Sequence, residues 1–178
     1  MNRVEKEKLR KILTKNAKLF QMAIEDRREY CMKEDFHLFT FIENELFSWE
    51  LQIAIDCATE GRIHLMMFLH PVVITTKTKL AYIEFANEAN LYLASAMGRF
   101  WVNDDNDYCY ECYLPEFLLE HEKELENQLF DKPFAHFRDC LTPLMKMKNG
   151  EWNSELAIKY LTELREKGYV DNEEYNLW

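Results

Sequence analysis

The sequence predicts an α+β fold in which an antiparallel sheet of about five strands packs on helices. Three observations lead to this prediction. Residues 80–97 repeat apolar side chains three and four positions apart, as a buried helix does. Residues 49–57 and 62–69 alternate between apolar and polar side chains, as half-buried strands do. Residues 99–114 alternate in the same way around an acidic turn, which indicates a hairpin directly after the helix.

The first elements follow from the same spacing. Residues 3–31 predict an amphipathic helix, with apolar residues such as Leu9 and Leu13 between lysines. Residues 36–44 are a short β-rich run and predict the first strand. Residues 49–57 predict the second strand, with an apolar face directed inward and Glu50, Gln52 and Asp56 directed outward.

The third predicted strand, residues 62–69, has an unusual outward face. Ile63, Leu65, Met67 and Leu69 share the inward face, so the residues between them point outward. Two of those outward residues, Met66 and Phe68, are apolar and lie beside His64 and His70. An apolar outer face predicts either a cover on both sides or contact with a partner.

The predicted central helix starts with Leu80 on its apolar stripe and ends before Gly98. In the following hairpin, Phe100 and Val102 share one face, while Arg99 and Trp101 share the other. Pro115 then opens a helix, which the sequence at 131–133 is expected to break because it contains a proline. Another helix follows to residue 148, and a last amphipathic helix runs from about residue 154 to Gly168.

Length and composition fit one domain with a small appendage. The chain has 178 residues, 48% of them hydrophobic, with only four glycines and four prolines, which is enough to bury a core. We expect a main α+β domain at residues 1–148 and a helical extension at 149–178, packed on the domain or beside it.

Charge limits the classes of partner. The net charge is −10, although residues 1–20 carry seven basic and two acidic side chains. Residues 104–131 carry ten acidic side chains and one basic side chain, a pattern expected to attract basic segments and to repel nucleic acid and anionic membranes. No uncharged apolar segment is long enough to span a bilayer, so we expect no membrane contact and a cytoplasmic location.

Several motifs suggest metal or redox chemistry, but their spacing argues against it. The five cysteines are an odd number in a chain with ample core, which favours reduced thiols over disulfides. Cys109 and Cys112 form a CxxC motif, yet residues three apart on a strand face opposite sides and do not converge on a metal. His136 and Cys140, four apart on a helix, supply only half a zinc site. The acidic turn lacks the glycine and the glutamate of a calcium loop.

The order of elements and one sequence stretch carry a family resemblance. The helix ends in NEAN, with Asn87 and Asn90, and GRFWVNDDND and a strand that ends in YLP follow. This arrangement resembles the YbjN-type family, whose members share the fold of class I chaperones of type III secretion systems. The likeness covers residues 1–145 and is strongest at 87–115, although the family often has a glycine where Asn106 and Asp107 stand here. The resemblance implies a bacterial binding or adaptor module without a catalytic motif.

Two functional hypotheses remain from the sequence. In the first, the chain is a non-enzymatic protein-binding or chaperone-like module, which forms a homodimer and contacts protein partners through Met66, Phe68 and Trp101. It then has no catalytic, cofactor-binding or metal-binding residues. In the second, it is a small-ligand-binding protein or an enzyme with a pocket that no motif signals. The nearest polar candidates for that pocket are His64, His70 and Glu50.

Overall fold

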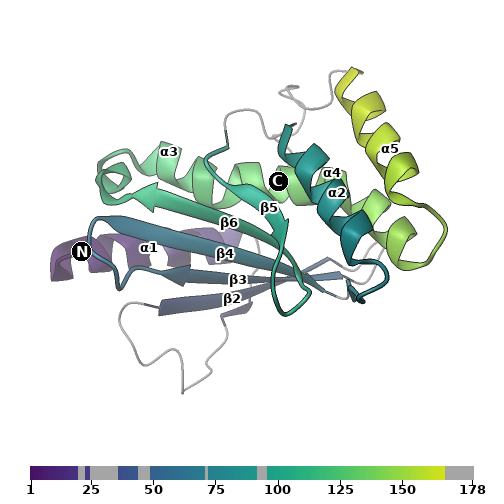
Figure 1. Cartoon of the computed structure of the whole chain (residues 1–178). Helices are drawn as coiled ribbons and strands as arrows, with labels where there is room; N and C mark the ends of the chain where they lie inside the picture. Colours follow the sequence, from purple (N-terminus) through teal and green to yellow (C-terminus); the bar gives the residue numbers. More distant parts are fainter. Residues whose placement is uncertain (20–22, 25–35, 44–48, 71, 92–95, 167–178) are drawn as a thin grey trace.

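A computed structural model describes the chain, apart from residues 20–22, 25–35, 44–48, 71, 92–95 and 167–178. It has the predicted α+β fold, with one antiparallel sheet and helices packed against it (Figure 1). None of the described helices is long and apolar enough to cross a bilayer. The elements are α1 (Arg3–Leu19), β1 (Ala23–Ile24), β2 (Phe36–Glu43), β3 (Trp49–Asp56), β4 (Arg62–His70), α2 (Lys79–Leu91), β5 (Arg99–Val102), β6 (Tyr108–Pro115), the 3₁₀ helix η1 (Glu116–Glu120), α3 (Glu122–Glu126), the π-helical turn η2 (Asn127–Asp131), α4 (Lys132–Lys148) and α5 (Ser154–Glu166).

The sheet has the strand order β1-β2-β3-β4-β6-β5, and each neighbouring pair is antiparallel. The predicted pairing of the second and third long strands is confirmed, with Ile53 of β3 opposite Met67 of β4. The β5–β6 hairpin joins the sheet through β6, which pairs with the edge of β4 that faces away from β3. Tyr110 of β6 therefore lies opposite Met67. The strand β1 has only two residues, so five longer strands form most of the sheet.

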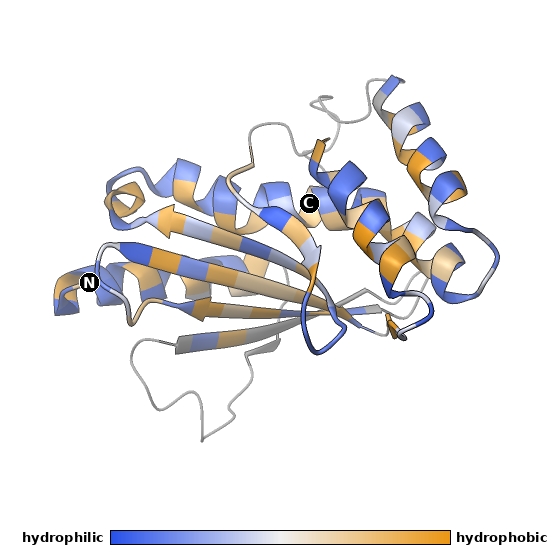
Figure 2. Cartoon of the chain, viewed as in Figure 1, coloured by the Kyte–Doolittle hydropathy of each residue, from blue (hydrophilic) through white to orange (hydrophobic). Residues whose placement is uncertain are grey.

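One face of the sheet forms the hydrophobic core. Helices α1 and α4 lie behind the sheet in Figure 1, and α2 lies beside β5. Figure 2 shows hydrophobic and hydrophilic residues alternating along these helices, as expected for elements that bury one side. Most apolar residues on this face of the sheet are fully buried, as alternation predicted, and Val102 is half-buried. The fully buried ones include Leu51, Ile53, Ile55, Ile63, Leu65, Met67, Leu69, Phe100, Tyr110 and Leu114.

The first helix is shorter than predicted. α1 ends at Leu19, and Ala23 and Ile24 pair with β2 instead of continuing the helix to residue 31. This segment forms a strand pair with β2 instead of a further helical turn. Strand pairing therefore outweighs the helical spacing of its apolar residues. The predicted remainder at residues 25–31 lies outside the described residues.

The central helix also departs from its prediction at the start. Leu80 is 67% exposed, whereas Tyr82, Phe85, Ala86 and Ala89 are buried. The buried side of α2 therefore begins at Tyr82, two residues after Leu80, and packs mainly against β5 and α5.

The expected break at residues 131–133 is wrong. The helical segment runs from α3 through the π-helical turn η2 into α4, and Pro133 stands in the first turn of α4. A proline lacks the N–H group and its ring crowds the carbonyl one turn earlier. The wider π-helical turn directly before Pro133 relieves both effects, so the chain stays helical.

The C-terminal helix α5 packs against α2 and α4. Its residues Ala157 and Leu161 are buried and belong to the same core cluster as the sheet. Near the start of the helix, the Ser154 hydroxyl donates a hydrogen bond to Glu84 of α2, 2.7 Å away. This helix thus extends the main core, while the predicted end at Gly168 lies outside the described residues.

Candidate functional site

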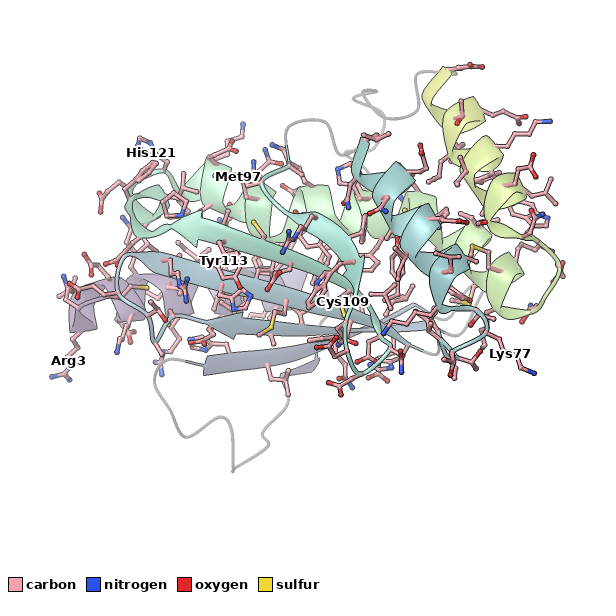
Figure 3. All side chains as sticks on the ribbon, in the orientation of Figure 1. Arg3, Lys77, Met97, Cys109, Tyr113 and His121 are labelled. Atoms are coloured by element: carbon pink, nitrogen blue, oxygen red, sulfur yellow. The ribbon has the colours of Figure 1, made fainter. Side chains whose placement is uncertain are left out.

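The second face of the sheet has no described helix over β3, β4 and β6, and we call it the open face (Figure 1). Figure 3 shows Tyr113 and Cys109 of β6 on this side of the sheet. The strand register places the other residues of this face beside them. The open face comprises Leu38, Glu50, Gln52, Ala54, Asp56, Arg62, His64, Met66, Phe68, His70, Arg99, Trp101, Cys109, Glu111 and Tyr113.

The structure brings Met66, Phe68 and Trp101 together on the open face. Met66 and Phe68 are neighbours on the same side of β4, and Phe68 lies in register with Cys109 and then with Trp101. In the other direction, Met66 lies in register with Ala54 of β3 and then with Leu38 of β2. Trp101 is 38% exposed and Met66, Phe68 and Leu38 are half-buried, whereas Ala54 and Cys109 between them are buried. These six residues form a continuous apolar path from β2 to β5, and we call it the apolar path.

A polar network of residues from β4, β5 and β6 lies beside the apolar path. The carboxylate of Glu111 contacts Nε2 of His64 at 3.0 Å and accepts a hydrogen bond from the Tyr113 hydroxyl at 2.8 Å. The rings of His64 and Tyr113 stack with their centroids 4.2 Å apart, and Arg99 reaches the same carboxylate at 3.5 Å. No sequence pattern indicated this network, because its residues come from three different strands.

The electrostatics of this network do not produce an activated nucleophile. Burial opposes ionisation of Glu111, but the hydrogen bonds with Tyr113, His64 and Arg99 outweigh it and lower its pKa. The bond to this charged carboxylate raises the pKa of Tyr113 above its usual value. Tyr113 therefore keeps its proton at neutral pH, and the network orients side chains rather than preparing one for reaction.

The polar candidates from the sequence are not assembled into one site. Glu50 and His70 are opposite each other on β3 and β4, at one end of the open face. His64 lies at the other end of β4, opposite Asp56 and Tyr113. Six residues of extended strand separate the two histidines by about 20 Å. They therefore do not share one catalytic centre.

The free edge of the sheet at β5 is covered by a side chain from α2. Asn90 donates a hydrogen bond from Nδ2 to the carbonyl of Phe100 at 2.8 Å and accepts one from its N–H at 2.6 Å. These two bonds reproduce what a further strand would offer to Phe100. The sequence analysis singled out Asn90 only as part of the NEAN stretch. No pattern indicated that its amide would bond the backbone of Phe100.

Two other motifs make contacts within the fold. In the acidic turn, the ammonium of Lys79 donates hydrogen bonds to Oδ1 of Asn106 at 2.9 Å and to the carbonyl of Asn103 at 3.3 Å. The lysine side chain thus places a positive charge beside this acidic turn. The CxxC cysteines face opposite sides of β6 as predicted, because Cys109 is on the open face and Cys112 in the core. Burial raises the pKa of both thiols to about 12. Among the described residues, no group of three or more metal-ligating side chains is placed to hold a metal ion.

The acidic stretch finds most of its partners within the chain. Lys15 of α1 contacts Glu122 at 3.2 Å and Glu126 at 2.7 Å, and Lys8 contacts Glu120 at 3.5 Å. The basic first helix and part of the acidic segment thus lie side by side, joined by these ion pairs. That this segment attracts basic partner segments stays a prediction.

An open groove of about 850 Å³ lies between the start of α1, the β3–β4 connection and η1. Carboxylates of Glu5, Glu60, Glu116 and Glu120 line it, together with the 64% exposed ring of Phe117. Several of these carboxylates already have partners. Glu116 accepts a hydrogen bond from the N–H of Gly61 at 2.8 Å, and Glu120 meets Lys8. The groove therefore offers space but few groups that converge on a ligand.

No family model, no curated protein and no solved structure matches this chain.

Proposed function

We propose that this chain is a non-enzymatic protein-binding module, of the chaperone or adaptor kind, which contacts its partner through the open face. The apolar path carries this proposal, because it joins Met66, Phe68 and Trp101 without a described helix above them. Removing apolar surface from water stabilises a complex by about 25 cal/mol per Å². A contiguous apolar strip with a polar surround is typical of a contact surface on a soluble protein.

The resemblance to the YbjN-type family supports the same kind of function. Under this proposal, the occupant of the open face is either a second copy of the chain, which gives the expected homodimer, or another protein. Catalysis has less support, since Tyr113 keeps its proton and the polar candidates His64 and His70 are far apart. A cytoplasmic location agrees with the proposal but forms no part of its argument.

Charged substitutions on the open face test this proposal. We expect Phe68→Glu and Trp101→Glu to abolish association, whether light scattering detects it as dimerisation or capture from cell extract detects it as a bound partner. A carboxylate in a desolvated contact costs several kcal/mol unless it is paired. Phe117→Glu is the matched control, because Phe117 is an exposed aromatic residue away from the open face. If both open-face variants associate like the unmodified chain, the proposal is wrong.

A small-ligand function is the alternative, and the groove beside Phe117 is the observation that favours it. Its volume of about 850 Å³ lies within the range of known ligand sites, about 300–1,000 Å³. Native mass spectrometry of the purified chain provides the test. A small molecule that copurifies with the unmodified chain and with Phe68→Glu, but is lost from Phe117→Glu, would support the alternative.

A further inference from the structure

The turn between α4 and α5 contains Asn149, the one asparagine of the sequence that a glycine follows. Both Asn149 and Gly150 are exposed, and Gly150 has a positive φ of 72°. The side chain of Asn149 donates a hydrogen bond from Nδ2 to Glu151 at 3.3 Å, which is longer than usual. An exposed amide before a glycine is open to attack by the next backbone nitrogen, because glycine has no Cβ to hinder the approach.

The reaction that this pair of residues supports is deamidation through a cyclic imide. A base removes the proton of the Gly150 N–H, and the nitrogen attacks Cγ of Asn149 to form a new C–N bond. The bond from Cγ to Nδ2 then breaks, and the nitrogen leaves as ammonia after taking up a proton. Water opens the five-membered ring at either of its carbonyl carbons. The product is therefore aspartate or isoaspartate at position 149, and water is the only co-reactant.

The end of α4 holds this pair away from reaction. The Gly150 N–H donates a hydrogen bond to the carbonyl of Met147 at 3.0 Å, so the nitrogen is engaged. The ψ of −3° at Asn149 places that nitrogen beside the backbone nitrogen of Asn149 rather than beside its side chain. Reaction therefore requires the last turn to open, and helix ends open at little cost in free energy. We propose that Asn149 is a site of spontaneous deamidation, and that the last turn of α4 controls its rate.

The new carboxylate would meet two negative groups. It would lie at the C-terminus of α4, where the helix dipole is negative. It would also lie beside Glu151, whose pKa is lowered by hydrogen bonds from Lys146 and from Asn149 itself. Isoaspartate further inserts one carbon atom into the backbone of the turn. Deamidation should therefore loosen the connection that positions α5, whose Ala157 lies in the core.

Incubation of the folded chain at mildly alkaline pH, followed by peptide mapping with mass spectrometry, tests the proposal. We expect the change from amide to acid at position 149 before any other asparagine, with both aspartate and isoaspartate as products. Asn153 is the internal comparison, because Ser154 follows it and its Oδ1 accepts a hydrogen bond from the N–H of Leu156 at 2.9 Å. Earlier reaction at Asn153 or at another asparagine overturns the proposal.

Unfolding in guanidinium chloride tests the control by α4. The reaction at position 149 should be several-fold faster in the unfolded chain, because the Gly150 hydrogen bond is lost. In the same denaturant, Gly150→Ala should slow it several-fold, since the added Cβ hinders the attack and no folded turn is left to be strained. Equal rates in the folded and unfolded chain, or in the unfolded chain with and without Gly150→Ala, contradict the proposal.

Hydrogen exchange measures the effect on α5. Asn149→Asp reproduces the new charge, and we expect faster exchange at Ala157 and Leu161 than in the unmodified chain. Asn149→Ser is the matched control, because it removes the amide without adding a charge. Equal exchange in the two variants would overturn the inferred effect on α5. None of these measurements involves the open face, so the proposed function is tested separately.

Discussion

Gly98 is the residue at which the backbone approaches the aromatic core most closely among the described glycines. A Cβ atom at this position would lie 2.3 Å from the Tyr110 ring and 2.7 Å from the carbonyl oxygen of Glu111. The ring of Tyr110 is fully buried, so it has no space to move away. The glycine is therefore required by contact rather than by its backbone angle, a requirement that sequence spacing does not reveal.

Replacement of Gly98 by alanine should destabilise the fold. We expect Gly98→Ala to lower the free energy of unfolding by about 3 kcal/mol or more, because a rigid backbone carbonyl and a buried ring must both shift. Urea unfolding measures the change. Gly150→Ala is the control: nothing lies within 4 Å of its added Cβ, and its positive φ of 72° costs only about 1–2 kcal/mol. A smaller loss for Gly98→Ala than for Gly150→Ala would contradict this account.

A pair of titratable residues on α4 lies under α5. His136, Asp139 and Cys140 line a small cavity of about 20 Å³, which Leu161 and Leu164 of α5 help to close. Burial lowers the pKa of His136 to about 4 and raises the pKa of Asp139 to about 6. Both groups are thus favoured in their neutral forms, as expected for side chains that apolar neighbours surround.

Asp139 should make stability depend on pH. Its folded-state pKa lies above the usual 3.8, so its contribution is greatest below about pH 4 and is lost as the pH rises through about 6. Asp139→Asn removes this loss, and we expect the variant to be more stable than the unmodified chain at pH 7–8 by on the order of 2 kcal/mol. The difference should vanish near pH 4. Asp104→Asn, at an exposed turn position, is the control for chemical unfolding at each pH.

At the scale of elements, the period-two pattern predicted the strands well. Alternation correctly assigned the inward residues of β4 and the outward positions of Met66, Phe68 and Trp101. A shift of one residue would turn every side chain of a strand to the opposite face, so the apolar pattern leaves little freedom in this assignment. The sequence did not predict that these three residues lie on neighbouring strands of one sheet. Their placement depends on the pairing of β4 with β6, which are separated by α2 and β5 along the chain.

Helix boundaries were predicted less well, because contacts with other elements determine them. Residues 23–24 pair with β2 and are not part of the first helix, in which the sequence had placed them. Pro133 did not end its helix, since the π-helical turn η2 made room for it. In both cases local propensity was overridden by the surrounding backbone.

The amide of Asn90 should be important for the β5 edge. We expect Asn90→Ala to cost about 1–3 kcal/mol, because two backbone groups of Phe100 lose their partner. Asn87→Ala, one turn earlier on an exposed position of α2, should change stability by less than about 0.5 kcal/mol. Thermal unfolding of the two variants compares them directly. Equal effects would show that the α2 asparagines do not secure the edge strand.

For the whole molecule, charge distribution depends on how distant segments fold together. The basic first helix and the acidic stretch after β6 are separate in the sequence, yet Lys15 contacts Glu126 across 111 positions. Net charge and local composition alone therefore do not show which carboxylates are paired within the chain. What the folded molecule offers instead is the apolar path, which is continuous only after five strands have paired.

Site-specific photocrosslinking tests most directly whether the open face is a protein-binding surface. A benzophenone-bearing amino acid is placed at Phe68, at Trp101 or, as a control, at Phe117, and intact cells that express the chain are irradiated. The proposal predicts covalent adducts with another polypeptide from positions 68 and 101 and none from position 117. Absence of adducts from both open-face positions, or equal yield from Phe117, would contradict it.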